Sequence, residues 1–394
     1  MKKTIKDIDV SGKKVIVRCD FNVPLDNGEI TDNSRITATI PTIDYLIEKG
    51  AKVILISHLG RPKGTPSSKF SLLPVKYELS SILGQEVLFI PAPQVITDGV
   101  IDQIDNMQPG QVMLLENIRF RKEEEEYSPG FAKELAALGD IFVNDAFGAA
   151  HRAHSSTVGI AEYLPAVSGL LMERELKYLG EVLDDPKRPF VAILGGSKVS
   201  DKITVINNLM KKADVLLIGG GMAFTFIKAN GNDIGTSIVD DHSLDLALEI
   251  EANAKELGVE FILPVDVVTA WEFDNDTKRE IHDIEIMPHH MMGLDIGPKT
   301  VKLFEEKIKN AGTVLWNGPM GVFEMPNFAA GTRGVGEAMA ESDATTIVSG
   351  GDSVAAVKEF GLTDRMTYVS TGGGASLELI EGRILPGIAA LEDK

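Results

Sequence analysis

The chain has 394 residues, of which 44% are hydrophobic and 25% charged, a composition that suits folded domains and excludes a disordered or fibrous protein. The formal net charge of −19 argues against non-specific nucleic-acid binding, which depends on Lys and Arg neutralising phosphates. The longest apolar runs fall far short of the roughly 18 residues that a membrane span needs, so we expect no membrane association.

Length and cysteine content bound the organisation and the compartment. At roughly 150 residues per domain the length gives about two or three domains, and we expect two. The single cysteine, Cys19, cannot form an intramolecular disulfide, which fits a reducing environment. The basic N-terminal residues run into Asp7 and Asp9 without an apolar segment, so we expect no secretory signal. We therefore expect a cytoplasmic protein, which we take to be a monomer.

Two series of short apolar segments follow one another along the chain, with helix-like stretches between them. Continuous apolar runs are typical of strands buried on both faces, and crossover helices between them indicate parallel sheets. The first series consists of Val15–Val17, Val53–Ile56, Val87–Ile90, Val112–Leu115 and Ile141–Val143. The second consists of Val191–Leu194, Val215–Ile218, Phe261–Leu263, Thr313–Trp316, Thr346–Val348 and Met366–Val369. The pattern predicts an α/β protein with two Rossmann-like domains, each a parallel sheet flanked by helices.

A segment rich in Leu, Glu and Lys, Leu171–Leu183, separates the two series and is followed by Asp184-Asp185-Pro186. Its helix-forming residues and the terminal proline predict a hinge helix that joins the domains. We therefore place the first domain at residues 1–170, the interdomain helix at 171–185 and the second domain at 186–375.

In the first half, polar residues follow the predicted strands, where ligands bind in doubly wound folds. Asp20 and Asn22 come after the first strand and offer acceptors for a hydroxyl group. A lone Arg is more often a surface ion-pair partner, but repetition at strand ends favours an anion site. Forked donors suit a phosphate and a carboxylate on one small molecule. The residues that would supply such donors are His58, Arg61, Arg119 and Arg152.

The second half carries glycine-rich turns directly after its predicted strands. Lys198 and Lys202 follow the first of these turns and share a helix face, because they are four residues apart. Backbone N–H groups at helix starts favour bound phosphate, although tight turns explain each glycine cluster about as well. Asp352 at a helix start is either an N-cap or a ligand of Mg²⁺ that bridges phosphates. The other turns are Gly219–Gly221, Asn317–Glu324, Gly350–Ser353 and Thr371–Ala375.

The run Val15-Ile16-Val17-Arg18-Cys19-Asp20-Phe21-Asn22-Val23-Pro24 resembles the signature of the phosphoglycerate kinase family. Other segments resemble family segments in the same order along the chain, and the resemblance runs from end to end. They are Ser57–Pro62, Asn144–Phe147, Gly195–Lys202, Trp316–Pro319, Gly350–Ser353 and Thr371–Ala375. Ser197, where many relatives carry Ala, is a mild variation.

The resemblance implies that the first domain binds 3-phosphoglycerate or 1,3-bisphosphoglycerate and that the second binds MgATP or MgADP. It implies that Glu324 holds the ribose, that Asp352 holds the magnesium, and that residues 376–394 return to the first domain. The implied substrate-binding positions are Asp20, Asn22, Arg35, His58, Arg61, Arg119 and Arg152. The implied nucleotide-binding positions are Lys198, Lys202, Gly219, Gly220, Gly293, Asn317, Glu324, Gly350, Gly351, Asp352 and Ser353.

The implied reaction is the reversible transfer of a phosphoryl group between ATP and the carboxylate of 3-phosphoglycerate, as in glycolysis and gluconeogenesis. A carboxylate is already ionised at neutral pH, so no general base is required. The catalytic candidates instead surround the transferring group with positive charge and backbone donors. They are Arg35, Lys198, Lys202 and, at a helix start, Gly373. Because the two ligand sets lie on different domains, we expect hinge closure.

Two other classes of function are weighed against this interpretation. A dehydrogenase should carry the fingerprint Gly-x-Gly-x-x-Gly, but Phe224 stands where the third glycine would be. A hinged periplasmic binding protein would need an export signal, and none is visible. The expected partners are therefore small molecules only.

Overall fold

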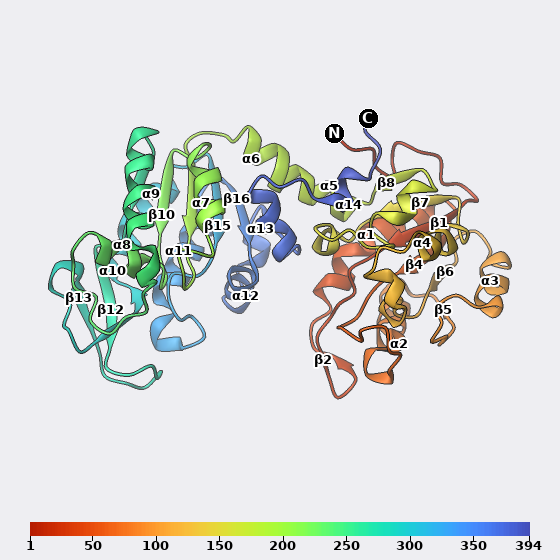
Figure 1. Ribbon diagram of the computed structural model, residues 1–394, viewed down its shortest axis with the longest axis horizontal. Helices are drawn as coiled ribbons and strands as arrows, with labels where there is room; N and C mark the ends of the chain where they lie inside the picture. The colour runs from red at the N-terminus through yellow and green to blue at the C-terminus, as the bar shows by residue number, and fades with distance from the viewer. The chain divides into compact units, whose positions relative to one another are not determined.

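The computed structural model describes residues 1–394, which form two compact units. The first unit comprises Met1–Lys177 together with Ile384–Lys394, and the second comprises Tyr178–Arg383. Figure 1 follows the chain through both units from red at the N-terminus to blue at the C-terminus. None of the helices combines the length and the apolar composition that crossing a membrane requires.

The first unit is built on a six-stranded parallel sheet in the order β5-β6-β4-β1-β7-β8. The central strand β1 pairs with β4 and β7 in register, so that Val15 lies opposite both Val53 and Ile141. Its strands are β1 Lys14–Arg18, β4 Lys52–Ile56, β5 Val87–Phe89, β6 Val112–Leu114, β7 Ile141–Asn144 and β8 Ala166–Ser168. Its longer helices are α1 Ser34–Glu48, α2 Leu73–Leu83, α3 Asp98–Asp105, α4 Pro129–Ala136 and α5 Leu170–Leu176. The β-branched strand residues are almost fully buried, which is why they read as apolar runs.

The second unit repeats this plan with a parallel sheet in the order β11-β10-β9-β15-β16-β17. Its strands are β9 Phe190–Leu194, β10 Val215–Ile218, β11 Glu260–Ile262, β15 Thr313–Asn317, β16 Thr345–Ser349 and β17 Tyr368–Val369. Its main helices are α7 Ile203–Met210, α8 Ala223–Ala229, α9 Leu244–Glu256, α10 Pro298–Lys309, α11 Ala330–Glu341, α12 Gly351–Glu359 and α13 Gly374–Ile380. The predicted fold class is confirmed: both units are parallel sheets flanked by helices (Figure 1).

A small antiparallel sheet in the second unit was not predicted from the sequence. Its strands β12 Asp266–Ala270, β13 Arg279–Asp283 and β14 Met292–Ile296 pair in the order β13-β12-β14. β13 is half exposed and rich in charge, so it lacks the apolar run that marks the buried parallel strands. β14 is nevertheless buried for most of its length and becomes part of the candidate site.

The two ends of the chain lie side by side in the first unit (Figure 1). Lys3 N donates to Glu392 O at 2.8 Å, and Gly387 N in the short helix α14 Pro386–Ala389 donates to Ala150 O at 2.8 Å. The residues that return are Ile384–Lys394. The expected return began earlier, at Ser376, but α13 belongs to the second unit, where it packs against α7 and Asn208 donates to Ile380 O.

The division between the units falls inside a helical stretch that the sequence placed at residues 171–185. It consists of α5, a π-helical turn over Lys177–Glu181 and α6 Val182–Asp184. The change from one unit to the other lies between Lys177 and Tyr178, at this turn.

Candidate functional site

Charged side chains gather at the carboxyl edge of the first sheet. Arg18 ends β1, and Asp20 and Asn22 follow it directly. His58 comes after β4, and Arg119 lies in a 3₁₀ turn after β6. Because these strands run parallel and β6, β4 and β1 are neighbours in the sheet, their following loops emerge at the same edge.

Side-chain hydrogen bonds join the loop after β1 to helix α1 and to the loop after β4. Arg35 Nη1, in the first turn of α1, donates to Asp20 Oδ2 at 2.8 Å. Asn22 Oδ1, in the loop after β1, accepts a hydrogen bond of 2.8 Å from Gly60 N, in the loop after β4. The Asp20 carboxylate therefore balances one arginine of the cluster, and Asn22 fixes the spacing of the two loops.

His58 lies at the centre of the positive charge. Its side chain is buried, and its pKa is well below the ordinary value, first because of burial and then because of Arg18, Arg119, Arg35 and Arg152. The histidine is therefore neutral at pH 7. The charges of four arginines lower the pKa of this one ring. This edge of the sheet therefore concentrates cations, although the net charge of the whole chain is −19.

Arg119 is almost completely buried beside this ring. Its Nη1 donates to Gly60 O at 2.8 Å, and its Nε lies 3.2 Å from Glu125 Oε1. Burial lowers the pKa of Arg119 to about 10, and Glu125 opposes that shift. The guanidinium is charged at pH 7 and is held in place by protein groups before any ligand binds.

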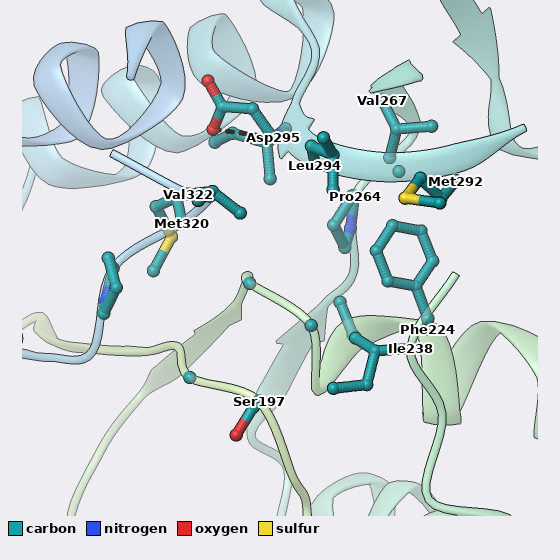
Figure 2. Close-up of a pocket in the computed structure, with 18 of the residues that line it drawn as sticks. Ser197, Phe224, Ile238, Pro264, Val267, Met292, Leu294, Asp295, Met320 and Val322 are labelled. Carbon is teal, nitrogen blue, oxygen red and sulfur yellow. Dashed lines mark hydrogen bonds between the residues drawn. The ribbon is translucent and has the colours of Figure 1, made fainter. Parts of the chain in front are cut away.

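In the second unit the loops after β9, β10 and β15, together with strand β14, line a cavity of about 520 Å³, shown in Figure 2. Its wall is largely apolar, and its polar side chains include Glu324 and Asp352. The apolar residues labelled in Figure 2 are Phe224, Ile238, Pro264, Val267, Met292, Leu294, Met320 and Val322. Glycines complete the wall: Gly196, Gly220, Gly221, Gly293 and Gly321. A shape of this kind suits a flat apolar ring with a polar chain attached.

The glycines are required because the loops approach one another backbone to backbone. A Cβ on Gly195 would lie 2.0 Å from Pro319 O, and one on Gly318 would lie 2.3 Å from Gly195 O. Gly220 has a φ of +66°, and its Cβ would lie 2.7 Å from Gly196 N. Side chains at these positions would push apart loops that follow the adjacent strands β10, β9 and β15. Close approach of three loops, rather than separate tight turns, explains this part of the glycine pattern.

Asp295 forms part of the cavity wall, but its carboxylate points away from the cavity (Figure 2). Its Oδ2 accepts from Gly331 N at 2.7 Å and its Oδ1 accepts from Ile296 N at 2.9 Å. Burial raises the pKa of Asp295 to about 8, against the effect of these two donors. The residue joins β14 to the start of α11 and so supports one wall of the cavity.

The phosphoglycerate kinase family model matches residues 5–383. The phosphoglycerate kinase of Clostridium botulinum (strain Alaska E43 / Type E3) is 57% identical over 393 residues, covering 100% of this chain and 99% of its own length. That of Clostridium tetani is 56% identical, covering 100% and 98%. The chain belongs to the phosphoglycerate kinase family.

Solved structures of the family agree with this assignment. The phosphoglycerate kinase from Coxiella burnetii superposes with a TM-score of 0.92 at 43% identity and covers 99% of this chain and 98% of its own. The enzyme from Pyrococcus horikoshii OT3 superposes with a TM-score of 0.84 at 33% identity, with the same coverage. The fold and the family predicted from the sequence are therefore both confirmed.

Most of the implied substrate residues of this phosphoglycerate kinase family member lie together. Arg152 Nε lies 3.2 Å from His151 Nε2, and the charge of Arg152 acts on His58 and Arg119. Arg61 differs from the others because it is exposed and forms no hydrogen bond or ion pair with the cluster. The residues brought together are Asp20, Asn22, Arg35, His58, Arg119 and Arg152.

Four of the implied nucleotide residues line the cavity: Gly220, Gly293, Glu324 and Asp352. Others support its loops. Lys202 Nζ donates to Asn317 Oδ1, Asn317 Nδ2 donates to Ser349 Oγ at 3.0 Å, and Gly318 N donates to Ser353 Oγ at 2.5 Å. Burial lowers the pKa of Lys202, and Asp352 opposes that shift. The implied residues outside the lining are Lys198, Lys202, Gly219, Asn317, Gly350, Gly351 and Ser353.

Lys198 and Gly373 stand apart from the cavity lining. Lys198 is exposed, and its charge contributes to lowering the pKa of Asp240, after the hydrogen bonds from Ser200 and Ser243. Gly373 precedes α13 with a φ of +52°, and a Cβ there would meet nothing within 4 Å. Both belong to loops at the carboxyl edge of the sheet, after β9 and β17 respectively.

Sequence reasoning missed three parts of the candidate sites: the apolar wall of the cavity, Asp295 and Arg18. The apolar wall was missed because a Phe or Met that lines a cavity has the same sequence pattern as one in the core. Asp295 was missed with its strand β14, although the polar residue between apolar neighbours in Gly293–Ile296 was a usable signal. Arg18 was noted at a strand end but was not included among the site residues, and its burial was not predicted.

Proposed function

We propose that this chain catalyses reversible phosphoryl transfer between ATP and the carboxylate of 3-phosphoglycerate, giving ADP and 1,3-bisphosphoglycerate. Membership of the phosphoglycerate kinase family supports this assignment. The observation that carries it is the cluster of arginines around the neutral, buried His58. Such a cluster suits a small molecule that bears both a phosphate and a carboxylate, because guanidinium groups are forked donors that bind both kinds of anion.

We propose that the cluster divides its donors between the anionic ends of the substrate. Arg119, Arg152 and His58 are placed to bind anionic oxygens, and Arg61 joins them from the exposed loop that follows Gly60. Asn22 and Asp20 supply polar atoms for the substrate hydroxyl. Arg35, which Asp20 holds at 2.8 Å in the free protein, is the donor best able to turn towards the transferring phosphoryl group, since its side chain is 36% exposed.

In the second unit we propose that the cavity binds the nucleotide. The apolar wall suits the adenine ring, Glu324 offers carboxylate oxygens to the ribose hydroxyls, and Asp352 faces the same space. No group of three or more metal-ligating side chains gathers anywhere in the chain. One carboxylate fits Mg²⁺ in this setting, because Mg²⁺ at nucleotide sites is held by one or two carboxylates together with phosphate oxygens and water. Asp352 would hold the ion, which would neutralise phosphate charge.

The chemical step requires no proton transfer from the protein. An oxygen of the substrate carboxylate bonds to the γ-phosphorus of ATP, and the bond from that phosphorus to the bridging oxygen breaks as ADP leaves. Arg35, Lys198, Lys202 and the backbone at Gly373 balance negative charge on the transferring group. Because the two ligand sets belong to different units, in-line transfer requires a domain movement that brings the substrates together.

The same reasoning extends to the state and place of the enzyme. Every proposed site residue comes from one chain, so we propose that the monomer is the active form. The one cysteine, Cys19, is free and buried, which favours a reducing compartment, and we propose the cytoplasm.

A coupled assay tests this function directly. ATP consumption is measured with 3-phosphoglycerate present or absent, and with Mg²⁺ present or removed by a chelator. We expect turnover only when both are present. ATP consumption that does not depend on 3-phosphoglycerate, or turnover of a nicotinamide cofactor instead, would contradict the proposal.

A binding experiment tests the residue assignment separately. Isothermal titration of 3-phosphoglycerate into the wild type and Arg119→Ala should show loss of affinity in the variant, because a buried donor is removed. Titration of MgADP into the same two proteins should give equal affinities. Weaker MgADP binding in Arg119→Ala would show that the two sites are assigned to the wrong units.

A further inference from the structure

Arg18 is a fully buried arginine beneath the cationic cluster. A buried charge is costly unless hydrogen-bond partners surround it. Its Nε donates to Ser156 Oγ at 2.8 Å, its Nη1 donates to Cys19 O, and its Nη2 lies 3.1 Å from His58 Nδ1. Arg18 therefore contacts a proposed substrate-binding residue, although no part of its own side chain is exposed.

The compensating charge comes from Glu124, which is also fully buried. Ser156 Oγ donates to Glu124 Oε1 at 2.6 Å, and Ser156 N donates to Glu124 Oε2 at 2.9 Å. Burial raises the pKa of Glu124 and lowers that of Arg18, and the charge of each opposes the shift of the other. The serine hydroxyl thus connects a buried carboxylate to a buried guanidinium, and the guanidinium connects to the imidazole.

The direction of these hydrogen bonds decides the state of His58. A guanidinium has five N–H donors and no acceptor, so His58 Nδ1 must accept from Arg18. The ring is neutral, since its pKa is well below the ordinary value through burial and the surrounding arginines. A neutral imidazole carries one proton, which must then be on Nε2. No residue of the chain forms a hydrogen bond with Nε2 of His58.

We propose that Arg18 is a positioning residue which, held by Ser156 and Glu124, fixes His58 as the Nε2–H tautomer. This tautomer offers a donor to an anionic substrate, whereas the other would present a lone pair to it. The consequence for substrate affinity rests on the proposed function, but the tautomer itself does not. The experiment therefore has one part without substrate and one part with it.

The first part is NMR of the full-length, substrate-free chain with ¹⁵N-labelled histidine. Long-range proton–nitrogen correlations distinguish the two neutral tautomers, and the His58 signals are identified by their loss in His58→Gln. We expect the pure Nε2–H pattern in the wild type. In Arg18→Lys we expect a mixture, since an ammonium cannot bond to Ser156 and to His58 with the geometry of the fork. Arg121→Lys is the matched control, because Arg121 pairs with Glu123 and Glu134 and does not contact His58.

The second part is steady-state kinetics. In Arg18→Lys the KM for 3-phosphoglycerate should rise by about 10- to 100-fold, the range for one hydrogen bond to a charged group, while the KM for MgATP stays unchanged. His58→Gln places an amide N–H near the position of Nε2 and has no tautomer to fix. In the His58→Gln background, Arg18→Lys should raise the KM for 3-phosphoglycerate by a factor at least several-fold smaller than in the wild-type background. A merely structural role for Arg18 would give the same loss in both backgrounds.

Several results would overturn the proposal. One is a wild-type spectrum that shows the Nδ1–H tautomer of His58. This measurement does not depend on the folding of any variant. Another is an unchanged tautomer in folded Arg18→Lys, and a third is an equal kinetic loss with and without His58. Ser156→Ala gives a milder test, because it removes the acceptor of Arg18 Nε and leaves both charges in place. Enzyme that shows the expected tautomers but no turnover with 3-phosphoglycerate would support the tautomer assignment and contradict the proposed function.

Discussion

Arg18, His58 and Arg119 are almost fully buried at the edge of the first sheet, whereas the corresponding edge of the second sheet is lined by glycines and apolar side chains. Both sites occupy the carboxyl ends of parallel strands. They differ in what makes them selective. The first site holds fixed cations, and the second is a cavity shaped by backbone atoms that approach one another closely.

The difference follows from the ligands that each site would take. A small, highly charged acid gives little apolar area to bury, so its affinity has to come from charged donors. Those donors are expensive to bury, which explains why Asp20, Glu124 and Glu125 accompany them. A nucleotide offers a large ring, so a shaped apolar wall contributes to its affinity. The first site should therefore lose function when a positive charge is removed. The second should lose function when an added side chain fills space between its loops.

Removal of Arg35 should have the largest effect on the first site. We expect Arg35→Ala to lower kcat by about 10²- to 10³-fold, the usual loss for one donor to a transition state. Its guanidinium is partly exposed and paired only with Asp20, so we expect it to follow the transferring phosphoryl group. Steady-state kinetics measure kcat, and calorimetry should show almost unchanged nucleotide affinity. A raised KM with normal kcat would instead make Arg35 a ground-state ligand.

Filling space should damage the second site without any change of charge. In Gly318→Ala the new Cβ would lie 2.3 Å from Gly195 O at a backbone φ of +104°. We expect the KM for MgATP to rise about tenfold and the free energy of unfolding to fall by about 1–3 kcal/mol. The KM for 3-phosphoglycerate should not change. Gly99→Ala is the control, because Gly99 lies in α3 with only one atom within 4 Å, at 3.9 Å. Unchanged MgATP kinetics in Gly318→Ala would contradict the inference that the second site depends on the close approach of its loops.

The parallel sheets were predictable because their strands are buried on both faces. All eleven predicted strands are present, from Val15–Val17 in β1 to Met366–Val369 around β17. β8 was missed because Ala166–Ser168 contains a single β-branched residue between Ala and Ser and so forms no apolar run. β13 was missed because the half-exposed, charged segment Arg279–Asp283 lacks an apolar run as well. The fold class can be predicted because many residues contribute to its pattern. β8 and β13 cannot be predicted in this way, because their strand conformation depends on the neighbouring strands with which they pair.

The candidate sites were predictable to the extent that they rest on unusual residues at strand ends. Repeated arginines and glycines in these places indicated an anion site and a phosphate site. The support of these residues was not predictable. Nothing in the run Lys122–Glu126 distinguishes Glu124, which is fully buried, from Glu126, which is exposed. The distinction depends on Ser156 and Arg18, which are far away in the sequence and were brought to Glu124 by folding.

The support of the second site contains a carboxyl group that should make stability depend on pH. The pKa of Asp295 is raised to about 8 by burial, compared with about 3.9 in an unfolded chain. Between these values the unfolded chain releases a proton that the folded chain keeps. The contribution of Asp295 to the free energy of unfolding is therefore largest at low pH and is lost as pH rises through this window, by about 1.4 kcal/mol per pH unit.

Asp295→Asn removes this proton equilibrium and nearly preserves the shape of the side chain. Chemical denaturation at pH 6 and at pH 7 should show the wild type losing about 1 kcal/mol of unfolding free energy relative to the variant. Asn offers one acceptor where Gly331 N and Ile296 N require two, so the variant should be less stable at the acid end. Parallel pH profiles for the two proteins would show that Asp295 ionises normally in the folded state.

The smallest expected effect concerns Glu125, which we expect to compete with the substrate for Arg119 in the first site. Its Oε1 lies 3.2 Å from Arg119 Nε, and its side chain is 38% exposed, so the pair contributes about 1 kcal/mol at most. Glu125→Gln should lower the KM for 3-phosphoglycerate by about two- to fivefold, because Arg119 no longer has to leave a carboxylate when the substrate binds. Glu126→Gln in the same acidic run is the matched control and should leave this KM unchanged. A higher KM in Glu125→Gln would mean that Glu125 orients Arg119 for the substrate, and the acidic residues of the first site would then assist binding as well as balance charge.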